Sequence, residues 1–415
     1  MSRESDLRHD LATLDPTLRN RLDAAGFDPE RLVTLAAPLL SRSPRSPGAD
    51  GDSLAGGTAD RNERNRVRGV VEPPRPGDVR DAPARADGDS AAYERCAALG
   101  AAALRRGEVA FCVMAGGMAT RMGGVVKALV EAFDGRSFLE LRLNENAFWS
   151  RRAETHVPLW LMTSDATDAP IRQALSKLGA AGHLGHVGTF RQDLGLRLTQ
   201  EGRLFVGDDG QPSTYAPGHG DLPDALRRSG LLSSFVDRGG KYVWIANLDN
   251  LGASIDEALL GSFIEQGADV LVEVAPKAEG DRGGIPVWAD AEGADGVTTR
   301  RLQVLEEFRL PAGFDANAVR VFNTNTFLVR AEPLLRANVR YSWFEVEKKV
   351  GARVAVQFER LLQELTAALP AVYSRVPRDG VASRFLPVKD FDELARRRDD
   401  IRAVAEARGM MPPKP

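Results

Sequence analysis

Cysteine and histidine are scarce in this 415-residue chain, which contains two cysteines and five histidines. Two cysteines cannot build a disulfide framework, and Cys112 lies in an apolar run, so a reducing compartment is the simplest interpretation. The histidines other than His219 have no ligand-like spacing to cysteines or carboxylates. We therefore predict neither a zinc site nor a serine–histidine–aspartate triad.

Long apolar runs and a large net charge are also absent. No apolar stretch approaches the roughly 18 residues of a membrane-spanning helix, and the charged first residues do not resemble a signal peptide. The formal net charge is −3, with acidic and basic residues interspersed, which argues against a general nucleic-acid or membrane surface. We therefore expect a cytoplasmic protein without nucleic-acid or membrane partners.

The first part of the chain divides into two segments of different composition. Leucines at spacings of three and four between Leu7 and Leu40 predict a helical N-terminal unit over residues 1–42. Residues 43–92 are rich in proline, glycine, aspartate, arginine and serine and have few large apolar residues. Such a composition buries too little surface to offset its ordering entropy, so we predict a flexible linker there.

From about residue 93, short apolar runs alternate with helical patterns. The runs predict strands at 109–114, 159–162, 242–246, 270–274 and 319–322. The helical patterns cover 93–106, 168–178, 222–236 and 254–266. This alternation predicts an α/β fold with a mostly parallel sheet. We assign residues 93–335 to this core and residues 336–415 to a small C-terminal unit.

A glycine-rich loop follows the first predicted strand of the core. It contains Ala115, Gly116 and Gly117, with Arg121 and Lys127 close behind. Glycines let backbone N–H groups approach anionic oxygens, and the two cations add positive charge. The spacing matches neither the dinucleotide-binding nor the P-loop pattern. The loop predicts a phosphate site, although a flexible turn with surface charges is the alternative.

Four further residues are candidates whose local pattern leaves the role open. Asp249 follows a predicted strand, where it can hold Mg²⁺ with phosphate oxygens or simply cap a turn. His219 lies between two glycines, as polar turn residues often do. Gln192 offers both a donor and an acceptor, as reading a uracil edge requires, or lies on the surface at a strand end. Lys389, after an apolar run, can reach a phosphate or remain solvated.

The order of several motifs resembles the UDP-sugar pyrophosphorylases. The first motif is the loop Ala115–Gly123 with Lys127, and the last is Arg384–Lys389. Between them follow Phe190–Gln192, Tyr215–Asp221, Asn247–Gly252, Pro276-Lys277, Gly283-Gly284, Leu305-Glu306 and Phe322–Asn325. Each motif alone is weak, whereas the ordered set, which covers most of the chain, is specific.

The resemblance implies a Rossmann-like sheet of the nucleotide-diphospho-sugar transferase (GT-A-like) type and a uridylyl transfer from UTP to a sugar 1-phosphate, with Mg²⁺. It implies catalytic roles for Arg121, Lys127 and Lys389 and a metal at Asp249. The implied nucleotide contacts are Ala115, Gly116, Gly117, Gln192, Gly218 and His219. The implied contacts to the sugar phosphate are Asn250, Lys277, Gly284, Glu306, Asn323 and Asn325.

Two branches of the family and a binding-only homologue compete. Gly218–Asp221 and Arg384–Lys389 are closer to the glucose enzymes, whereas Arg121 and the preceding 95–110 segment are closer to the N-acetylhexosamine enzymes. We expect glucose 1-phosphate as the substrate. The loop departs from the family pattern at Met118, Ala119 and Val126, which would suit a homologue that binds UTP or a UDP-sugar without turnover.

The segment after Lys389 is short. Only 26 residues follow it in the 415-residue chain, and they predict one charged helix over Phe391–Arg408. Enzymes of the glucose branch often continue into a β-helical domain used in assembly. We expect no such domain here, and a monomer or a small homo-oligomer.

Overall fold

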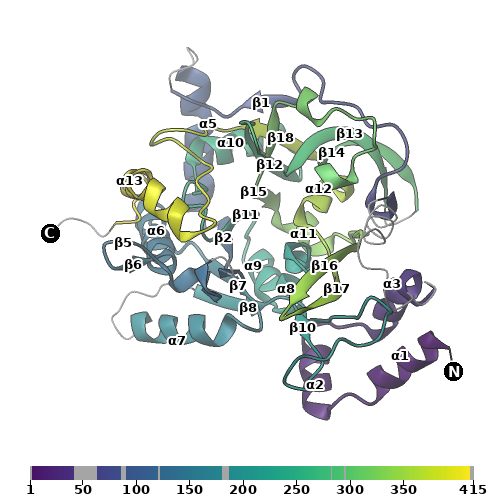
Figure 1. The fold of residues 1–415 in the computed structure, drawn as a ribbon. Helices are drawn as coiled ribbons and strands as arrows, with labels where there is room; N and C mark the ends of the chain where they lie inside the picture. The colour runs from purple at the N-terminus through teal and green to yellow at the C-terminus, as the bar shows by residue number, and fades with distance from the viewer. Residues whose placement is uncertain are drawn as a thin grey trace.

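An eight-stranded sheet forms the centre of the molecule, with helices on both of its faces (Figure 1). The computed structural model describes residues 2–41, 63–85, 90–119, 122–179, 187–281, 283–293 and 296–411. The strands lie in the spatial order β1 (Val79–Asp81), β18 (Ala371–Arg375), β12 (Val270–Pro276), β15 (Val321–Arg330), β11 (Tyr242–Asn247), β2 (Val109–Met114), β7 (Leu159–Thr163) and β8 (Val187–Arg191).

The sheet is mostly parallel, as the alternating pattern predicts. Strand β15 runs antiparallel to both neighbours, β11 and β12. Every other neighbouring pair is parallel. The predicted α/β fold is therefore confirmed, with strands at four of the five expected places and the fifth beginning at Val321, two residues later than expected.

The strands are apolar throughout because both faces of the sheet are covered. In β2, Val109, Phe111 and Val113 join one hydrophobic core, while Ala110 and Cys112 join the other. The first core is completed by helices α5 (Ser90–Arg105), α6 (Phe138–Arg152), α7 (Asp168–Gly179), α10 (Glu257–Gln266) and α13 (Phe391–Ala407). The second is completed by α8 (Leu222–Arg228), α9 (Leu231–Asp237), α11 (Ala331–Arg336) and α12 (Leu365–Ala368).

Smaller ribbons surround the sheet. They pair β3 (Met118–Ala119) with β4 (Val125–Val126), β5 (Glu131–Phe133) with β6 (Arg136–Ser137), β9 (Gly195–Leu196) with β10 (Thr214–Tyr215), β13 (Gly284–Glu292) with β14 (Thr298–Glu306), and β16 (Phe344–Val350) with β17 (Arg353–Glu359). The single helix expected over 222–236 is instead the pair α8 and α9. Gly230, with φ of 73°, adopts a left-handed conformation that interrupts the helix.

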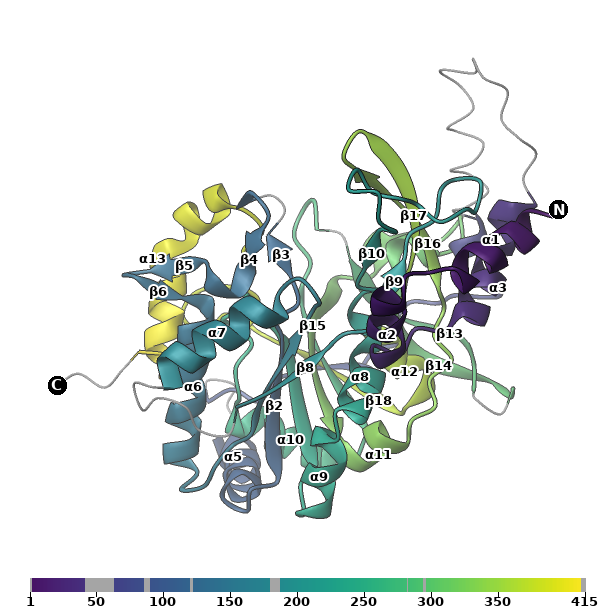
Figure 2. The same cartoon turned by 90° about the horizontal axis from the view of Figure 1, so that it is seen from below.

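The predicted helical N-terminal unit consists of α1 (Arg3–Ala12), α2 (Pro16–Ala24) and α3 (Pro29–Leu40). Ser2, Asp15 and Asp28 cap their N-termini by accepting hydrogen bonds from backbone N–H groups. Their leucines share a third hydrophobic core with residues of β9 and β17. Figure 2 shows the three helices on the opposite side of the sheet from α13.

The prediction of a flexible linker over residues 43–92 is wrong for residues 63–85. In residues 63–85, Glu72 forms a bridge with Trp288, and β1 pairs with β18 at the edge of the central sheet. Backbone pairing adds to the contacts of the few apolar side chains of this segment, of which Val67, Val71 and Val79 pack against the second core. Residues 42–62 and 86–89 lie outside the described residues, so the linker remains a prediction there.

Residues 336–415 do not form a separate C-terminal unit, contrary to expectation. Strand β18 lies between β1 and β12 in the central sheet, and Leu394, Ile401 and Val404 of α13 join the first core. A five-residue strand far along the chain gives no sequence signal of which sheet it enters. Among the helices of the described residues, none is long and apolar enough to cross a membrane.

Candidate active site

A cavity of about 310 Å³ lies at the edge of the sheet where β2 and β11 end. These strands are parallel neighbours, so the loops that follow them meet at the same edge. The cavity is lined by Met114, Ala115, Gly116, Gly117, Met118, Lys127, Met162, Gln192, Ala216, Gly218, His219, Asn247, Leu248 and Asp249. All six predicted nucleotide contacts are among them, together with Lys127 and Asp249.

The two glycines of the loop play different roles in this wall. A Cβ on Gly116 would lie 2.4 Å from Oε1 of Gln192 and 3.3 Å from the amide nitrogen of Ser164, so packing requires glycine there. A Cβ on Gly117 would meet nothing within 4 Å. Gly117 therefore leaves open space at the cavity surface, where a ligand can approach the backbone.

The loop positions that depart from the family pattern form a small hairpin. Met118 pairs with Val126 and Ala119 pairs with Val125 in the β3–β4 ribbon. The turn of this ribbon includes Gly123 and Gly124, both with positive φ. Two of the three changed residues, Met118 and Val126, thus face each other across the ribbon, whereas Ala119 pairs with Val125. Arg121, the first predicted catalytic residue, lies outside the described residues.

Gln192 joins two parts of the nucleotide side of the cavity. It follows β8, is 8% exposed, and donates from Nε2 to the carbonyl of Gly218 (3.1 Å) and to Oδ1 of Asp221 (3.3 Å). Since a carbonyl oxygen only accepts, the atom facing Gly218 must be the amide nitrogen. The amide oxygen then lies against Gly116.

His219 is held as a neutral ring. Its Nδ1 accepts a hydrogen bond from the backbone N–H of Leu362 at 3.0 Å, so Nδ1 carries no proton. Burial lowers the pKa of His219 to about 4. The proton of the neutral ring is therefore on Nε2, which makes this nitrogen a hydrogen-bond donor at the cavity wall.

Asp249 connects three segments that are distant in the sequence. Its Oδ2 accepts from Nζ of Lys127 at 2.7 Å and from the backbone N–H of Val388 at 3.1 Å. The side chains of Lys127 and Asp249 are 20% and 14% exposed. The carboxylate therefore ties the glycine-rich loop and the segment before Lys389 to the end of β11.

Lys389 lies beside this junction and does not line the cavity. It is exposed, and its backbone N–H donates to Glu393 at the start of α13. Burial would raise the pKa of Asp281, but hydrogen bonds from Arg378 and from the N–H of Ala278, together with the charge of Lys389, hold it below its usual value. The Lys389 ammonium thus lies near Asp281, which is not among the residues that line the cavity.

Asn250 is not placed for the predicted contact to a sugar phosphate. It is 1% exposed, its Nδ2 donates to the carbonyl of Arg384 at 3.1 Å, and its Oδ1 accepts from the N–H of Leu386 at 2.7 Å. Both ends of the amide are therefore used on the backbone. Asn250 instead fixes the segment that leads to Lys389.

Arg142 supports the loop that carries Asp249, a role not anticipated from the sequence. Its guanidinium is fully buried on α6 and pairs with Glu145 at 2.7 Å. It also donates to the backbone carbonyls of Asn247, Leu248, Asn250 and Ala253. An arginine between leucines on a helix gave no sign of these partners, because they follow a strand about a hundred residues later.

Three predicted sugar-phosphate residues form a second group outside the cavity lining. Gly284 and Glu306 are paired across β13 and β14, and Lys277 binds Glu307 at 2.8 Å. Burial raises the pKa of Glu306 to about 6, and the charge of Glu307 adds to the shift. Gln363 donates to Glu306, so this carboxyl group already has a polar partner.

Asn323 and Asn325 connect this region to the cavity through a β-bulge. The register between β12 and β15 shifts after Glu273, and Asn325 adopts a φ of 59°. Asn325 donates from Nδ2 to Oδ1 of the cavity residue Asn247 at 3.2 Å, and its N–H donates to Asn323. Its own Oδ1 is buried without a hydrogen-bond partner among the described residues. The bulge therefore leaves one buried acceptor of Asn325 uncompensated within the described residues.

A mostly parallel α/β sheet with a polar cavity at the carboxyl ends of its strands is the arrangement of a ligand-binding open α/β protein. A UDP-glucose phosphorylase from Trypanosoma brucei has a TM-score of 0.67 and 21% identity, covering 91% of this chain and 77% of that protein. An inhibitor-bound UDP-N-acetylglucosamine pyrophosphorylase from the same organism has a TM-score of 0.67 and 20% identity, covering 88% and 81%. At these identities the likeness shows the fold.

The chain belongs to the UTP–glucose-1-phosphate uridylyltransferase family, whose profile matches residues 90–414. A probable UTP–glucose-1-phosphate uridylyltransferase from Schizosaccharomyces pombe is 29% identical over 316 residues, which are 72% of this chain and 60% of that protein. The chain thus spans about three fifths of the length of this relative. The family resemblance of the ordered motifs is confirmed.

Proposed function

We propose that the protein is a uridylyltransferase that joins UTP and glucose 1-phosphate to give UDP-glucose and pyrophosphate. The observation that carries this proposal is the single cavity that unites the glycine loop, Gln192, His219 and the Lys127–Asp249 pair. Membership of the family and the relative's name support the choice of UTP and glucose 1-phosphate.

In the proposed reaction, an oxygen of the sugar phosphate attacks the α-phosphorus of UTP. The bond between the α-phosphorus and the bridging oxygen breaks, and pyrophosphate leaves with the electron pair. A phosphate monoester is already largely anionic at neutral pH, so the nucleophile needs no general base. Catalysis then depends on in-line placement and on neutralising the charge of the phosphates.

Three cationic side chains neutralise the negative charge of the phosphates at two positions, the leaving pyrophosphate and the sugar phosphate. Lys127, with Arg121 from the same loop, stabilises the leaving pyrophosphate. Lys389 holds the sugar phosphate against the α-phosphate from the other side of Asp249. Lys127 is bound to Asp249 at 2.7 Å, so the phosphates of a bound nucleotide would compete with the carboxylate for the ammonium.

The donor set around Asp249 fits Mg²⁺ bound together with the nucleotide. No cluster of three or more histidine, cysteine or acidic side chains lies ready for a metal in the described part of the chain. Mg²⁺ needs only one or two carboxylates when phosphates and water fill its other positions. Asp249 would supply that carboxylate, and the ion would neutralise phosphate charge and orient the phosphates.

We also propose a cytoplasmic location and a monomer or small homo-oligomer as the working form. Cys96 and Cys112 are buried free thiols, which supports a reducing compartment. Light scattering coupled to size-exclusion chromatography measures the oligomeric state directly.

A pyrophosphate-release assay tests the function. We expect release from UTP only when both glucose 1-phosphate and Mg²⁺ are supplied. Parallel reactions with galactose 1-phosphate and N-acetylglucosamine 1-phosphate distinguish the glucose enzyme from the N-acetylhexosamine enzyme, whose fold is equally similar. Thermal stabilisation by UTP without turnover of any of the three would identify a binding-only homologue and contradict the proposal.

A further inference from the structure

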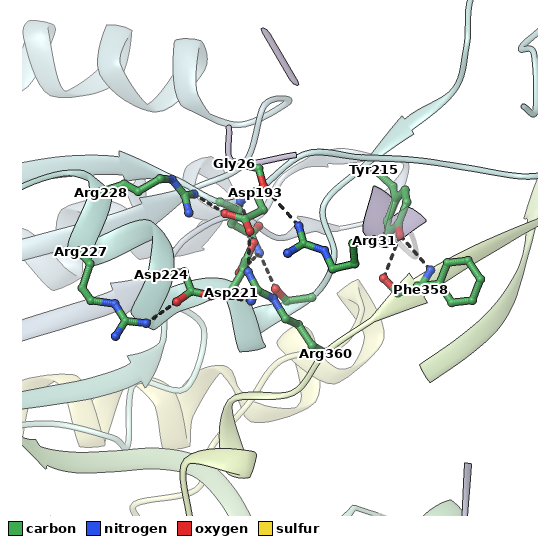
Figure 3. Close-up of polar contacts among 12 residues, drawn as sticks. Gly26, Arg31, Asp193, Tyr215, Asp221, Asp224, Arg227, Arg228, Phe358 and Arg360 are labelled. Atoms are coloured by element: carbon green, nitrogen blue, oxygen red, sulfur yellow. Dashed lines mark hydrogen bonds and ion pairs between the residues drawn. The ribbon is translucent and has the colours of Figure 1, made fainter. Parts of the chain in front are cut away.

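A cluster of paired charges, drawn in Figure 3, adjoins the nucleotide wall of the cavity, because Asp221 accepts a hydrogen bond from Gln192 and Asp193 follows Gln192 in the chain. Its members are Asp193, Asp221, Asp224, Arg227, Arg228 and Arg360. The three acidic and three basic groups balance in formal charge. The side chains of Arg360 and Asp193 are only 4% and 5% exposed, so their charges depend on one another for compensation.

Arg360 is the centre of this cluster. Its guanidinium donates to Asp193 at 2.5 Å and to Asp224 at 2.6 Å, and it lies 5.1 Å from the ring centroids of both Tyr341 and Trp343. The aromatic rings and the carboxylates hold the guanidinium in one orientation. Because Asp193 directly follows Gln192, the position of Arg360 sets the position of the strand end that carries Gln192.

The backbone of Arg360 holds the opposite half of the same wall. Its N–H donates to the carbonyl of Pro217 at 2.8 Å, and its carbonyl accepts from the N–H of Gly220 at 3.0 Å. A Cβ on Gly218 would lie 2.7 Å from this carbonyl oxygen. Arg360 therefore contacts both Asp193, which follows Gln192, and the Pro217–Gly220 segment, in which the carbonyl of Gly218 accepts a hydrogen bond from Gln192.

This arrangement fixes which atom of Gln192 is available to a ligand. Asp221 accepts from the N–H of Asp193 at 2.7 Å with one oxygen and from Nε2 of Gln192 with the other. Oδ1 of Asp221 and the carbonyl oxygen of Gly218 together accept both hydrogens of the Gln192 amide. Within the described residues no hydrogen bond ends on Oε1 of Gln192, which therefore remains as an acceptor beside Gly116 at the cavity.

We propose that Arg360 is a positioning residue for base selection: it holds Asp193 and the Pro217–Gly220 segment so that Gln192 presents an acceptor to the base. The inference rests on the proposed function, because it concerns the nucleotide used at that site. Uracil has an N–H donor at N3, which matches this acceptor. Cytosine has a bare acceptor nitrogen at N3, which opposes it.

The test compares UTP with CTP in the full-length protein carrying Arg360→Met. Methionine fills a similar volume without charge, so the Gln192 amide loses its fixed orientation. We expect the preference for UTP over CTP in kcat/KM to fall roughly tenfold, because selection by a fixed acceptor is lost. The KM for glucose 1-phosphate should change by less than about twofold, since none of the residues that Arg360 binds is a predicted sugar-phosphate contact.

Arg197→Met is the matched control. Arg197 is partly buried, hydrogen-bonds to Gln357, Ser213 and Thr214, and does not line the cavity. We expect it to keep the UTP-to-CTP preference. Asp224→Asn weakens one arm of Arg360 and should lower the preference in the same direction by less. Thermal unfolding of each variant identifies any that do not fold.

Equal losses with UTP, CTP and glucose 1-phosphate in folded Arg360→Met would show a merely structural role and overturn the inference. So would an unchanged preference in folded Asp224→Asn if Arg360→Met does not fold. Calorimetric binding of UTP and CTP separates this result from a failure of the proposed function. Selective UTP binding that Arg360→Met abolishes supports the inference even if no sugar phosphate is turned over.

Discussion

Lys127 and Asp249 form an ion pair of 2.7 Å between residues 122 positions apart in the sequence. The same carboxylate oxygen accepts the backbone N–H of Val388, so the pair joins the glycine loop, the end of β11 and the segment before Lys389. Neither side chain is fully buried, which leaves the pair accessible to a competing anion. Lys127 and Asp249 both line the cavity, so an anion bound there would meet this pair.

Removing the ammonium of this pair should abolish most of the turnover. For Lys127→Ala we expect a loss of about 10²–10³ in kcat, because a charge aimed at the leaving pyrophosphate is removed. Steady-state pyrophosphate release measures it. Lys177→Ala, at an exposed position of α7 that is not among the residues lining the cavity, is the control and should retain full activity. A loss of less than about threefold in Lys127→Ala would contradict the role.

The two glycines Gly220 and Gly117 should respond oppositely to alanine. A Cβ on Gly220 would lie 2.5 Å from the backbone of Arg360 and Leu361, so Gly220→Ala should lower the free energy of unfolding by about 1–3 kcal/mol. Gly117→Ala meets nothing in the free protein and should leave stability unchanged. It should nevertheless raise the KM for UTP, if the nucleotide approaches that backbone. Urea unfolding and kinetics of both variants give the comparison, and equal stabilities would be inconsistent with it.

Arg142→Met should destabilise the protein by about 3–5 kcal/mol, because Glu145 is left as an unpaired buried carboxylate. The double variant Arg142→Met with Glu145→Gln removes that charge and should recover part of the loss. Urea unfolding measures both. If the double variant is no more stable than the single one, the buried charge is not the cause. In the double variant we still expect reduced kcat, since four carbonyls of the Asp249 loop have lost their donor.

The His219 ring should remain neutral down to a pH of about 4. Its pKa in the folded protein is below that of an unfolded histidine, so its contribution to stability is present above about pH 6.5 and is lost as the pH falls toward 4. Burial raises the pKa of Asp221, and that contribution changes in the opposite direction over an overlapping range. The pH dependence of the total stability therefore does not isolate the titration of His219. NMR titration of the His219 ring, assigned with His219→Asn, is decisive, and a midpoint near 6.5 would refute the burial argument.

Local sequence patterns predicted most of the strands and helices of the core but not which distant segments pair with one another. The strands around β2 and β11 follow from apolar runs whose residues alternate between two buried faces. The segment 63–85 and strand β18 were misassigned because their stability comes from pairing with strands far away in the sequence. The amino-acid composition of a segment indicates how much apolar surface it can bury. It does not indicate with which strand the backbone of that segment will pair.

The candidate site, like the fold, was only partly predicted from local sequence patterns. Ordered motifs predicted six nucleotide contacts, and all six line one cavity. Asn250 carried the same kind of signal, yet its amide is consumed by the backbone of Arg384 and Leu386. Arg142 and Arg360 carried no motif signal, because an arginine becomes a support only when the chain brings carbonyls and carboxylates around it.

The sequence by itself determined the α/β class, the glycine loop and the candidate residues for nucleotide and phosphate contacts, since these depend on local periodicity and residue type. The tertiary structure alone decided that Lys127 is bound to Asp249, that His219 is neutral, and that Gln192 presents its oxygen. Each of these states depends on burial and on hydrogen-bond partners from distant segments, and both arise only when the chain has folded.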